Sequence, residues 1–170
     1  MIRKMNSSDF EKVYKLVCDL EETCFDLDKM KTIMNELIHS HDIFVFEDND
    51  NIIGYLDLKI EYQMHHCDKV AEVIEFCVDP KHRSQHIGAK LFEYAKTYAK
   101  DNGCVVLDLT TNQKRHRAHK FYENHGMDQT HYKYTLNLIE LKRALIHINK
   151  CLYFISHLFL LPHDQQELPW

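Results

Sequence analysis

The pattern of apolar and polar residues along the chain predicts a series of alternating strands and helices. Apolar side chains recur with helical spacing at Phe10, Val13, Leu16 and Val17, whereas residues 131–138 alternate with the two-residue period of a strand. Residues 104–109 form an apolar run interrupted only by Asp108, which is typical of a strand buried on both faces. The pattern predicts strands at 2–5, 42–47, 52–62, 70–78, 104–109 and 131–138, and helices at about 10–20, 27–38, 87–101 and 114–125.

Capping and turn residues mark the ends of several elements. Ser8 and Glu11 fit a capping box at the start of the first helix, and Asn102-Gly103 fits a helix end. The order of the elements, without repeats or a linker, predicts one α/β domain with a mixed sheet (α+β) over residues 1–138.

Residues 139–170 follow this domain as a separate C-terminal extension. Apolar residues recur there at helical spacing at Leu141, Leu145, Ile148 and Leu152. We therefore expect an extra helix, packed either on the domain or on a second subunit, so that a homodimer is one arrangement to test.

The composition excludes several classes of protein. The chain has 170 residues, 45% of them hydrophobic and 28% charged, which is typical of a folded, soluble domain. The formal net charge of −5 gives no basic surface for nucleic acid. The longest apolar run, residues 151–161, is too short to span a bilayer, and the N-terminus lacks the apolar segment of a signal peptide. Six cysteines without a CxxC pair indicate reduced thiols, so we expect a cytoplasmic protein without membrane partners.

The segment from Val73 to Leu91 carries the clearest chemical signal. A strand ends at Asp79-Pro80, a loop containing Arg83 follows, and Gly88 opens an amphipathic helix. Backbone N–H groups converge at a helix N-terminus, where the helix dipole also favours an anion. The segment lacks the GxxxxGK[ST] pattern of ATP-binding loops, so it predicts a different kind of phosphate site.

Here the chain resembles the GNAT N-acetyltransferases, whose Arg/Gln-x-x-Gly-x-Gly/Ala signature corresponds to Arg83-Ser-Gln-His-Ile-Gly88. His86 stands where glycine is usual, and histidine tolerates a positive φ better than most residues. The resemblance covers residues 1–138 and implies acetyl-coenzyme A as cosubstrate. It implies that the pyrophosphate binds at Arg83, Ser84, Gln85, His86, Ile87, Gly88 and Ala89, that the pantetheine arm lies along Phe76, Cys77 and Val78, and that Asn112 touches the coenzyme.

A closer resemblance, to the aminoalkylphosphonate N-acetyltransferases, lies in three further segments. They are Gln63-Met-His-His66, Glu72-Val-Ile-Glu75 and the run from Leu109 to Tyr122. The resemblance implies an aminoalkylphosphonate acceptor and use of a divalent cation. Residues after 138 have no counterpart in that branch.

The reaction needs a base for the acceptor ammonium and an acid for the departing thiolate. Glu72 stands at the family's position for the base, and Glu75 is the second candidate. In a regular strand these two side chains point to opposite faces, so only one is expected to act directly. Tyr122 matches the family's tyrosine and is the expected acid. A backbone amide near Cys77 or Val78 is expected to stabilise the oxyanion, and direct transfer in a ternary complex requires no cysteine nucleophile.

The acceptor site is less determined by the sequence. Lys114, Arg115 and His116 form a cationic cluster that could hold a phosphonate, contact the coenzyme or simply face water. His65 or His66 could bind a metal or the substrate, but adjacent residues in an extended segment cannot both bind one ion.

Other functions remain open at this point. The acceptor could instead be an amino acid, a polyamine or an aminoglycoside, an alternative that Glu61, Asp68, Glu72 and Glu75 support. A non-catalytic acyl-coenzyme A sensor would bind the coenzyme without turnover.

Overall fold

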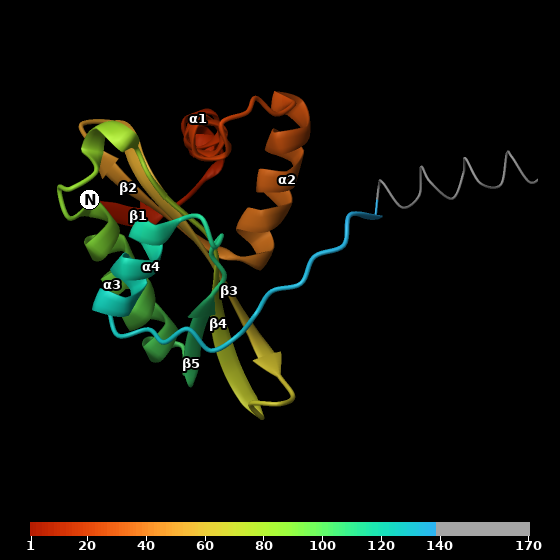
Figure 1. Cartoon of the computed structure of the whole chain (residues 1–170). Coiled ribbons are helices and arrows are strands. Elements are labelled where there is room, and N and C mark those ends of the chain that lie inside the picture. Colours follow the sequence, from red (N-terminus) through yellow and green to blue (C-terminus); the bar gives the residue numbers. More distant parts are fainter. Residues whose placement is uncertain (139–170) are drawn as a thin grey trace, which may run out of the picture. The chain divides into compact units, whose positions relative to one another are not determined.

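The computed structural model describes residues 1–138 and shows a five-stranded mixed sheet with four α-helices (Figure 1). The strand order is β1-β2-β3-β4-β5; all neighbouring pairs are antiparallel except β4 and β5, which are parallel. This confirms the predicted mixed-sheet fold. The elements are β1 (Ile2–Lys4), a 3-10 turn η1 (Ser7–Asp9), α1 (Phe10–Glu21), α2 (Leu27–Ser40), β2 (Asp42–Asp48), β3 (Asn51–Gln63), β4 (Asp68–Val78), a 3-10 turn η2 (Pro80–His82), α3 (Ile87–Asp101), β5 (Val106–Leu109) and α4 (His116–Asn124).

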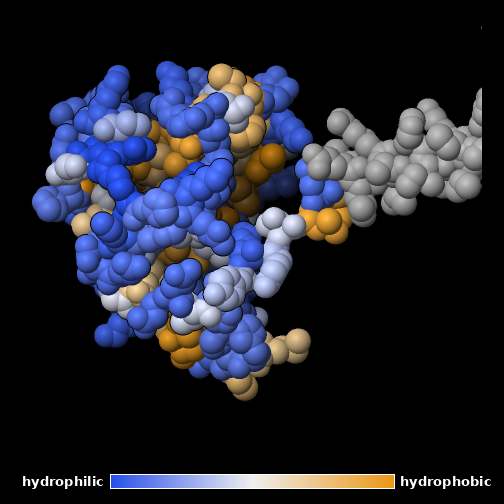
Figure 2. Space-filling model, viewed as in Figure 1, coloured by the Kyte–Doolittle hydropathy of each residue, from blue (hydrophilic) through white to orange (hydrophobic). Residues whose placement is uncertain are grey.

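Helices cover the two faces of the sheet, because alternate strand residues are apolar on both sides. Val45 packs with α1 and α2, whereas its neighbour Phe44 packs with α3 on the opposite face. Helix α4 lies beside α3 (Figure 1), where Phe121 contacts the fully buried ring of Phe92. Figure 2 shows mostly hydrophilic residues on the face in view, with hydrophobic ones visible mainly in the gaps between them.

Strand β4 contains one extra residue in its ladder with β3. Asp57 lies opposite Glu75 and Leu58 lies opposite Val73, so Ile74 has no partner across the ladder. Such a bulge shifts the alternation of side chains by one residue along the bulged strand.

The parallel strands β4 and β5 pair over only four residues. Their register runs from Val70 opposite Val106 to Val73 opposite Leu109. Beyond Val73, at the bulge, β4 continues to Val78 while β5 ends at Leu109. The two strands therefore part just after Val73, which leaves one side of the last five residues of β4 without a partner in β5.

Three predictions from the sequence need correction. Asn6 and Asp9, not Ser8 and Glu11, form the capping box, because a 3-10 turn precedes α1. Strand β5 is half-buried rather than covered on both faces, since it lies at the end of the strand order. Residues 131–137 form no strand; alternation alone does not make a strand unless a sheet edge supplies backbone partners.

The chain divides into two compact units, residues 1–127 and 128–170. The first unit contains every strand of the sheet. In the second, the described residues 128–138 are all exposed. The predicted C-terminal helix lies outside the described residues, and the predicted domain boundary at residue 138 stays a prediction. Across residues 1–138, no helix has both the length and the apolar character needed to cross a membrane.

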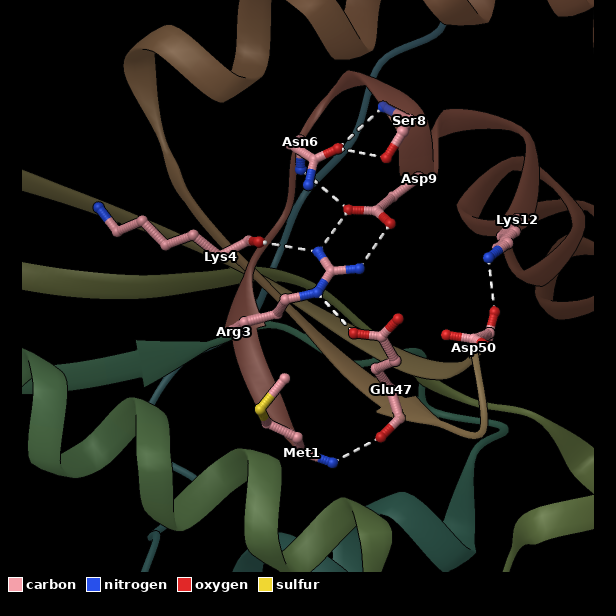
Figure 3. A network of polar contacts seen from close by, with 9 residues as sticks. All are labelled: Met1, Arg3, Lys4, Asn6, Ser8, Asp9, Lys12, Glu47 and Asp50. Carbon is pink, nitrogen blue, oxygen red and sulfur yellow. Dashed lines mark hydrogen bonds and ion pairs between the residues drawn. The ribbon is translucent and has the colours of Figure 1, made fainter.

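A buried carboxylate anchors the start of the chain to the sheet (Figure 3). Arg3 on β1 donates to both oxygens of Asp9, at 2.7 and 2.8 Å, and its Nε donates to Glu47 on β2 at 2.7 Å. The backbone N–H of Asn6 also donates to Asp9 Oδ2, at 3.0 Å. Because Asp9 is only 2% exposed, these donors replace the water that its charge loses. The network fixes the turn that directs α1 across the sheet.

Asp9→Asn should therefore destabilise the fold in a pH-dependent way. Arg3 holds the pKa of Asp9 below its ordinary value, so the stabilisation exists above the pKa of an unfolded aspartate, about 4, and disappears as the pH falls through the folded value. At pH 7 we expect the variant to lose about 2 kcal/mol of unfolding free energy, as for a hydrogen bond to a charged group. Urea unfolding at pH 7 and pH 3 measures this. Asp48→Asn, at an exposed position on β2, is the control, and equal midpoints for both variants at pH 7 would contradict the assignment.

Candidate active site

The loop between β4 and α3 bends through two left-handed residues. Ser84 has φ of 66° and His86, the N-cap of α3, has φ of 60° and ψ of 15°. Left-handed residues within a turn bring successive backbone N–H groups toward one point and create an anion-binding concavity. His86 thus adopts the conformation expected where related loops carry glycine.

The first turn of α3 adds further donors to this concavity. Lys90 N–H donates to His86 O at 3.0 Å and begins the helical hydrogen-bond series. The amides of residues 87–89 therefore precede that series and have no acceptor within the helix. A Cβ on Gly88 would meet Phe76, Val78 and Phe121 side chains at 3.5–3.8 Å, which is ordinary contact. The packing of the protein itself therefore does not require glycine at this position.

Arg83 braces this loop rather than extending from it. Its Nε donates to the carbonyl oxygen of Val78, the last residue of β4, at 3.3 Å. Asp79 caps the turn by accepting from the Lys81 amide at 2.8 Å. The loop is therefore held at the same end of β4 where the strand has parted from β5.

The end of β4 presents its residues alternately to the two faces. Phe76 and Val78 pack on the α3 side, and Gly88 lies close to both. Cys77 points to the α1 side, where its thiol contacts Leu16 O at 3.7 Å. Burial raises the pKa of Cys77 to about 11, so the thiol stays protonated at neutral pH and is a poor nucleophile.

The bulge at Ile74 overturns the expectation that Glu72 and Glu75 face opposite sides. Glu72 lies opposite Lys59 and Glu75 lies opposite Asp57. Lys59 and Asp57 are two residues apart on β3 and share a face, and residues directly opposite in a ladder also share a face. Both glutamates therefore point to the α1/α2 side of the sheet.

Glu75 is held by a buried tyrosine that the sequence analysis missed. The Tyr55 hydroxyl donates to Glu75 Oε2 at 2.6 Å, and Tyr55 is only 2% exposed. Beside it, His41 Nδ1 lies 2.7 Å from Oδ1 of Asp57, which is 3% exposed. Burial raises the pKa of Asp57, and His41 opposes this. Polar residues at alternate positions of an otherwise apolar strand, at Tyr55, Asp57 and Lys59, were the available signal.

Tyr122 lies on α4 within an aromatic cluster. Its ring is 5.8 Å from Phe92 and 5.4 Å from Phe121. Burial raises the pKa of Tyr122, and Arg115 opposes the rise. The phenol therefore carries its proton at neutral pH. Arg115, the N-cap of α4, also opposes the burial that raises the pKa of Cys77.

The three residues of the predicted cationic cluster have different surroundings. Arg115 Nη2 donates to Glu21 Oε1 at 2.9 Å and links the start of α4 to the end of α1. The Lys114 amide donates to Asn112 Oδ1 at 2.9 Å, so the Asn112 side chain shapes the turn before α4. His116, the first residue of α4, is exposed, as is the Lys114 side chain.

His65 and His66 lie far from this loop. They occupy the turn between β3 and β4, not an extended segment, and their ring centroids are 4.3 Å apart. Strand β4 has 11 residues, so its two ends are roughly 35 Å apart at the rise of a β-strand. Within residues 1–138, no three His, Cys, Asp or Glu side chains are grouped to hold a metal ion. The described residues therefore do not fit the divalent cation.

Comparison with known proteins identifies the family. The profile of the acetyltransferase (GNAT) family matches residues 7–127. The chain belongs to the GNAT acetyltransferase family. The match ends where the first compact unit ends, at residue 127.

A relative of known sequence agrees with this assignment. An aminoalkylphosphonate N-acetyltransferase from Salmonella typhimurium is 28% identical over 139 residues, which cover 79% of this chain and 88% of the relative. This supports the resemblance to that branch.

Solved structures show the same GNAT fold. A transcriptional regulator from Bacillus halodurans has a TM-score of 0.75 at 22% identity, over 81% of this chain and 98% of that one. An aminoglycoside N-acetyltransferase solved with coenzyme A has a TM-score of 0.70 at 20% identity, over 81% of this chain and 93% of that one.

The buried thiol gives a direct test of the geometry at the end of β4. We expect iodoacetamide at pH 8 to label the exposed Cys24 and Cys67 of the folded GNAT protein and to leave Cys77 unlabelled, because a thiol with a pKa of about 11 is scarcely ionised there. Peptide mass spectrometry reads the result, and the urea-unfolded protein, in which all three react, is the control. Labelling of Cys77 as fast as Cys67 would contradict the described packing.

Proposed function

We propose that this GNAT protein transfers the acetyl group of acetyl-coenzyme A to the primary amine of a small molecule, in a ternary complex and without an acyl-enzyme intermediate. One observation carries the proposal: the loop of left-handed residues Ser84 and His86 stands at the head of α3, after the stretch of β4 that continues beyond its pairing with β5. A diphosphate needs converging donors, and an extended pantetheine arm needs a free strand side.

Specific residues would hold the coenzyme. Donors for the diphosphate would come from the backbone at Ser84, Gln85, His86, Ile87, Gly88 and Ala89, with Arg83 bracing the loop. Phe76, Cys77 and Val78 would line the pantetheine arm, and Asn112 is a further proposed contact. The coenzyme supplies the activated acetyl thioester.

The chain's own groups would then move two protons. A carboxylate of β4, Glu72 or Glu75, takes the proton from the acceptor ammonium, and the freed nitrogen attacks the thioester carbonyl carbon. The new C–N bond forms, an amide near Cys77 or Val78 stabilises the oxyanion, and the C–S bond breaks. The nitrogen loses its second proton to solvent to give the neutral amide, and Tyr122 gives its proton to the departing thiolate and regains one from solvent. The raised pKa of Tyr122 keeps that proton available at pH 7.

The proposed acceptor is an aminoalkylphosphonate. The named relative from Salmonella typhimurium supports this choice. Arg115 also supports it, because a guanidinium suits a phosphonate and Arg115 is the N-cap of α4, the helix that carries Tyr122. Lys114 and His116 are further candidates for the same role. His65 and His66, at the opposite end of β4, and a metal ion have no part in the mechanism.

A cationic acceptor such as a polyamine or an aminoglycoside is the second candidate. Glu61, Glu72 and Glu75 share one face of β3 and β4, because Glu61 lies two residues from Lys59 and Lys59 lies opposite Glu72. Carboxylates on one face favour a substrate with more than one ammonium group. A homodimer and a cytoplasmic location stay predictions.

An amine screen tests the proposed reaction. Coenzyme A release is measured with aminomethyl- and 2-aminoethylphosphonate, spermidine, an aminoglycoside and glycine, each with magnesium and with chelator. We expect the phosphonates to react fastest and the chelator to have no effect. Coenzyme binding without turnover of any amine would instead indicate an acyl-coenzyme A sensor.

Variants of the proposed acid and base belong in the same assay. Loss of the working base lowers kcat by about 100-fold or more, so one of Glu72→Gln and Glu75→Gln should be strongly impaired. Tyr122→Phe should lower kcat because the thiolate loses its proton donor. Full activity in all three variants would remove the catalytic assignment.

Gly88→Ala tests the proposed diphosphate site without disturbing the fold. The added Cβ makes only ordinary contacts in the protein, so we expect an unchanged melting temperature. The same Cβ stands beside the proposed backbone donors, and we expect the Kd for coenzyme A to rise about 10-fold, or about 1.4 kcal/mol. Calorimetric titration measures the Kd. Gly54→Ala is the contrasting variant: its Cβ would lie 3.1 Å from Cys77 O and Leu91 Cδ1, so it should lower the melting temperature.

A further inference from the structure

The Tyr55–Glu75 hydrogen bond joins a rigid core residue to an exposed carboxylate. Tyr55 lies opposite Cys77, two residues beyond Glu75 on β4, so its hydroxyl reaches diagonally across the ladder. The Tyr55 ring is packed in the core under α1 and α2, whereas Glu75 is exposed. A long glutamate side chain loses rotamer freedom when one oxygen is fixed in this way.

We propose that Glu75 is the base for the acceptor ammonium and that Tyr55 is the residue that positions it. This inference rests on the proposed acetyl transfer and selects one of its two candidate carboxylates. It also gives a function to the buried hydroxyl of Tyr55, which takes no part in the proton transfers of the proposed reaction.

The position of Glu75 along β4 favours it over Glu72. Glu72 lies where β4 is still paired with β5, opposite Asp108, whereas Glu75 lies after the strands have parted. Glu72 also lies opposite Lys59 in the ladder; Glu61, which pairs with the Lys59 ammonium, raises the pKa of Lys59, and Glu72 adds to this rise. Glu75 is next to the stretch of β4 proposed to hold the thioester end of the coenzyme.

Tyr55 can hold the carboxylate without giving up its proton. Burial raises the pKa of Tyr55 far above its ordinary value, and the neighbouring Glu75 raises it further. The phenol therefore remains a neutral donor to Oε2. The other carboxylate oxygen, Oε1, receives the proton from the ammonium, and the nitrogen lone pair that this step frees forms the C–N bond.

The pair of His41 and Asp57 completes the surroundings of Glu75. Asp57 lies directly opposite Glu75, and His41, the C-cap of α2, approaches Asp57 Oδ1. The carboxylate of Asp57, which lies opposite Glu75, is thus hydrogen-bonded to its own partner, His41. The hydroxyl of Tyr55 is therefore the contact that holds Glu75, and the Asp57–His41 pair lies opposite it on the same face of the sheet.

A double-mutant cycle tests the proposal with the best amine from the screen. We measure kcat and both KM values for wild type, Tyr55→Phe, Glu75→Gln and the double variant. Tyr55→Phe removes only the hydroxyl, and we expect kcat to fall about 10-fold through misplacement of the base, with KM for acetyl-coenzyme A within about 2-fold. In the Glu75→Gln background the same change should have no further effect on kcat, because the base it positions is gone.

Two controls separate positioning from a general structural effect. Tyr62→Phe removes a hydroxyl from an exposed tyrosine on the same strand and should leave kcat unchanged. In the Glu72→Gln background, Tyr55→Phe should still lower kcat about 10-fold, as expected for independent sites.

The outcomes distinguish the inference from the proposed function. Wild-type kcat in Tyr55→Phe, an equal loss in the wild-type and Glu75→Gln backgrounds, or full activity in Glu75→Gln would each overturn the inference while acetyl transfer stands. A wild-type protein that acetylates no amine would overturn the proposed function itself, before any variant is compared.

Discussion

Ile74 has no partner in the ladder between β3 and β4, and the arrangement of the site depends on this β-bulge. It turns Glu72 and Glu75 to the same face of the sheet, which a regular strand would not do. It also coincides with the end of pairing between β4 and β5. One local irregularity therefore gathers the carboxylates and frees the side of the strand that the coenzyme is proposed to use.

Three pairs of polar groups with a buried member tie separate elements of residues 1–138 together. Arg3 and Asp9 join β1 to the start of α1, His41 and Asp57 join the end of α2 to β3, and Tyr55 joins β3 to Glu75 on β4. The buried groups of these three pairs thus have partners, as the cost of removing charge and dipoles from water requires. The first pair serves the fold, whereas the other two lie beside the proposed reaction centre, where the same requirement also fixes side-chain positions.

Several elements could be predicted closely because their signals are local. Helix α3 begins and ends where the pattern placed it, at Ile87 and Asp101, and the left-handed His86 fits the tolerance of histidine for positive φ. The alternation at residues 131–138 was misleading: a period of two shows that a segment can be a strand, but a strand forms only where another segment pairs with its backbone. Likewise, the apolar run that forms β5 could not show that this strand ends the sheet order of the first unit.

The sequence by itself determined the family, the mixed sheet and the loop from Arg83 to Gly88, because these depend on residue types at fixed short spacings. Only the tertiary structure decided that Glu72 and Glu75 share a face, that Tyr55 holds Glu75, and that the adjacent His65 and His66 lie at the opposite end of β4 from the loop. The physical reason is that a bulge, a diagonal hydrogen bond and the length of a strand arise from pairing between segments far apart in the chain. The periodicity of one segment does not determine the register in which a neighbouring strand pairs with it.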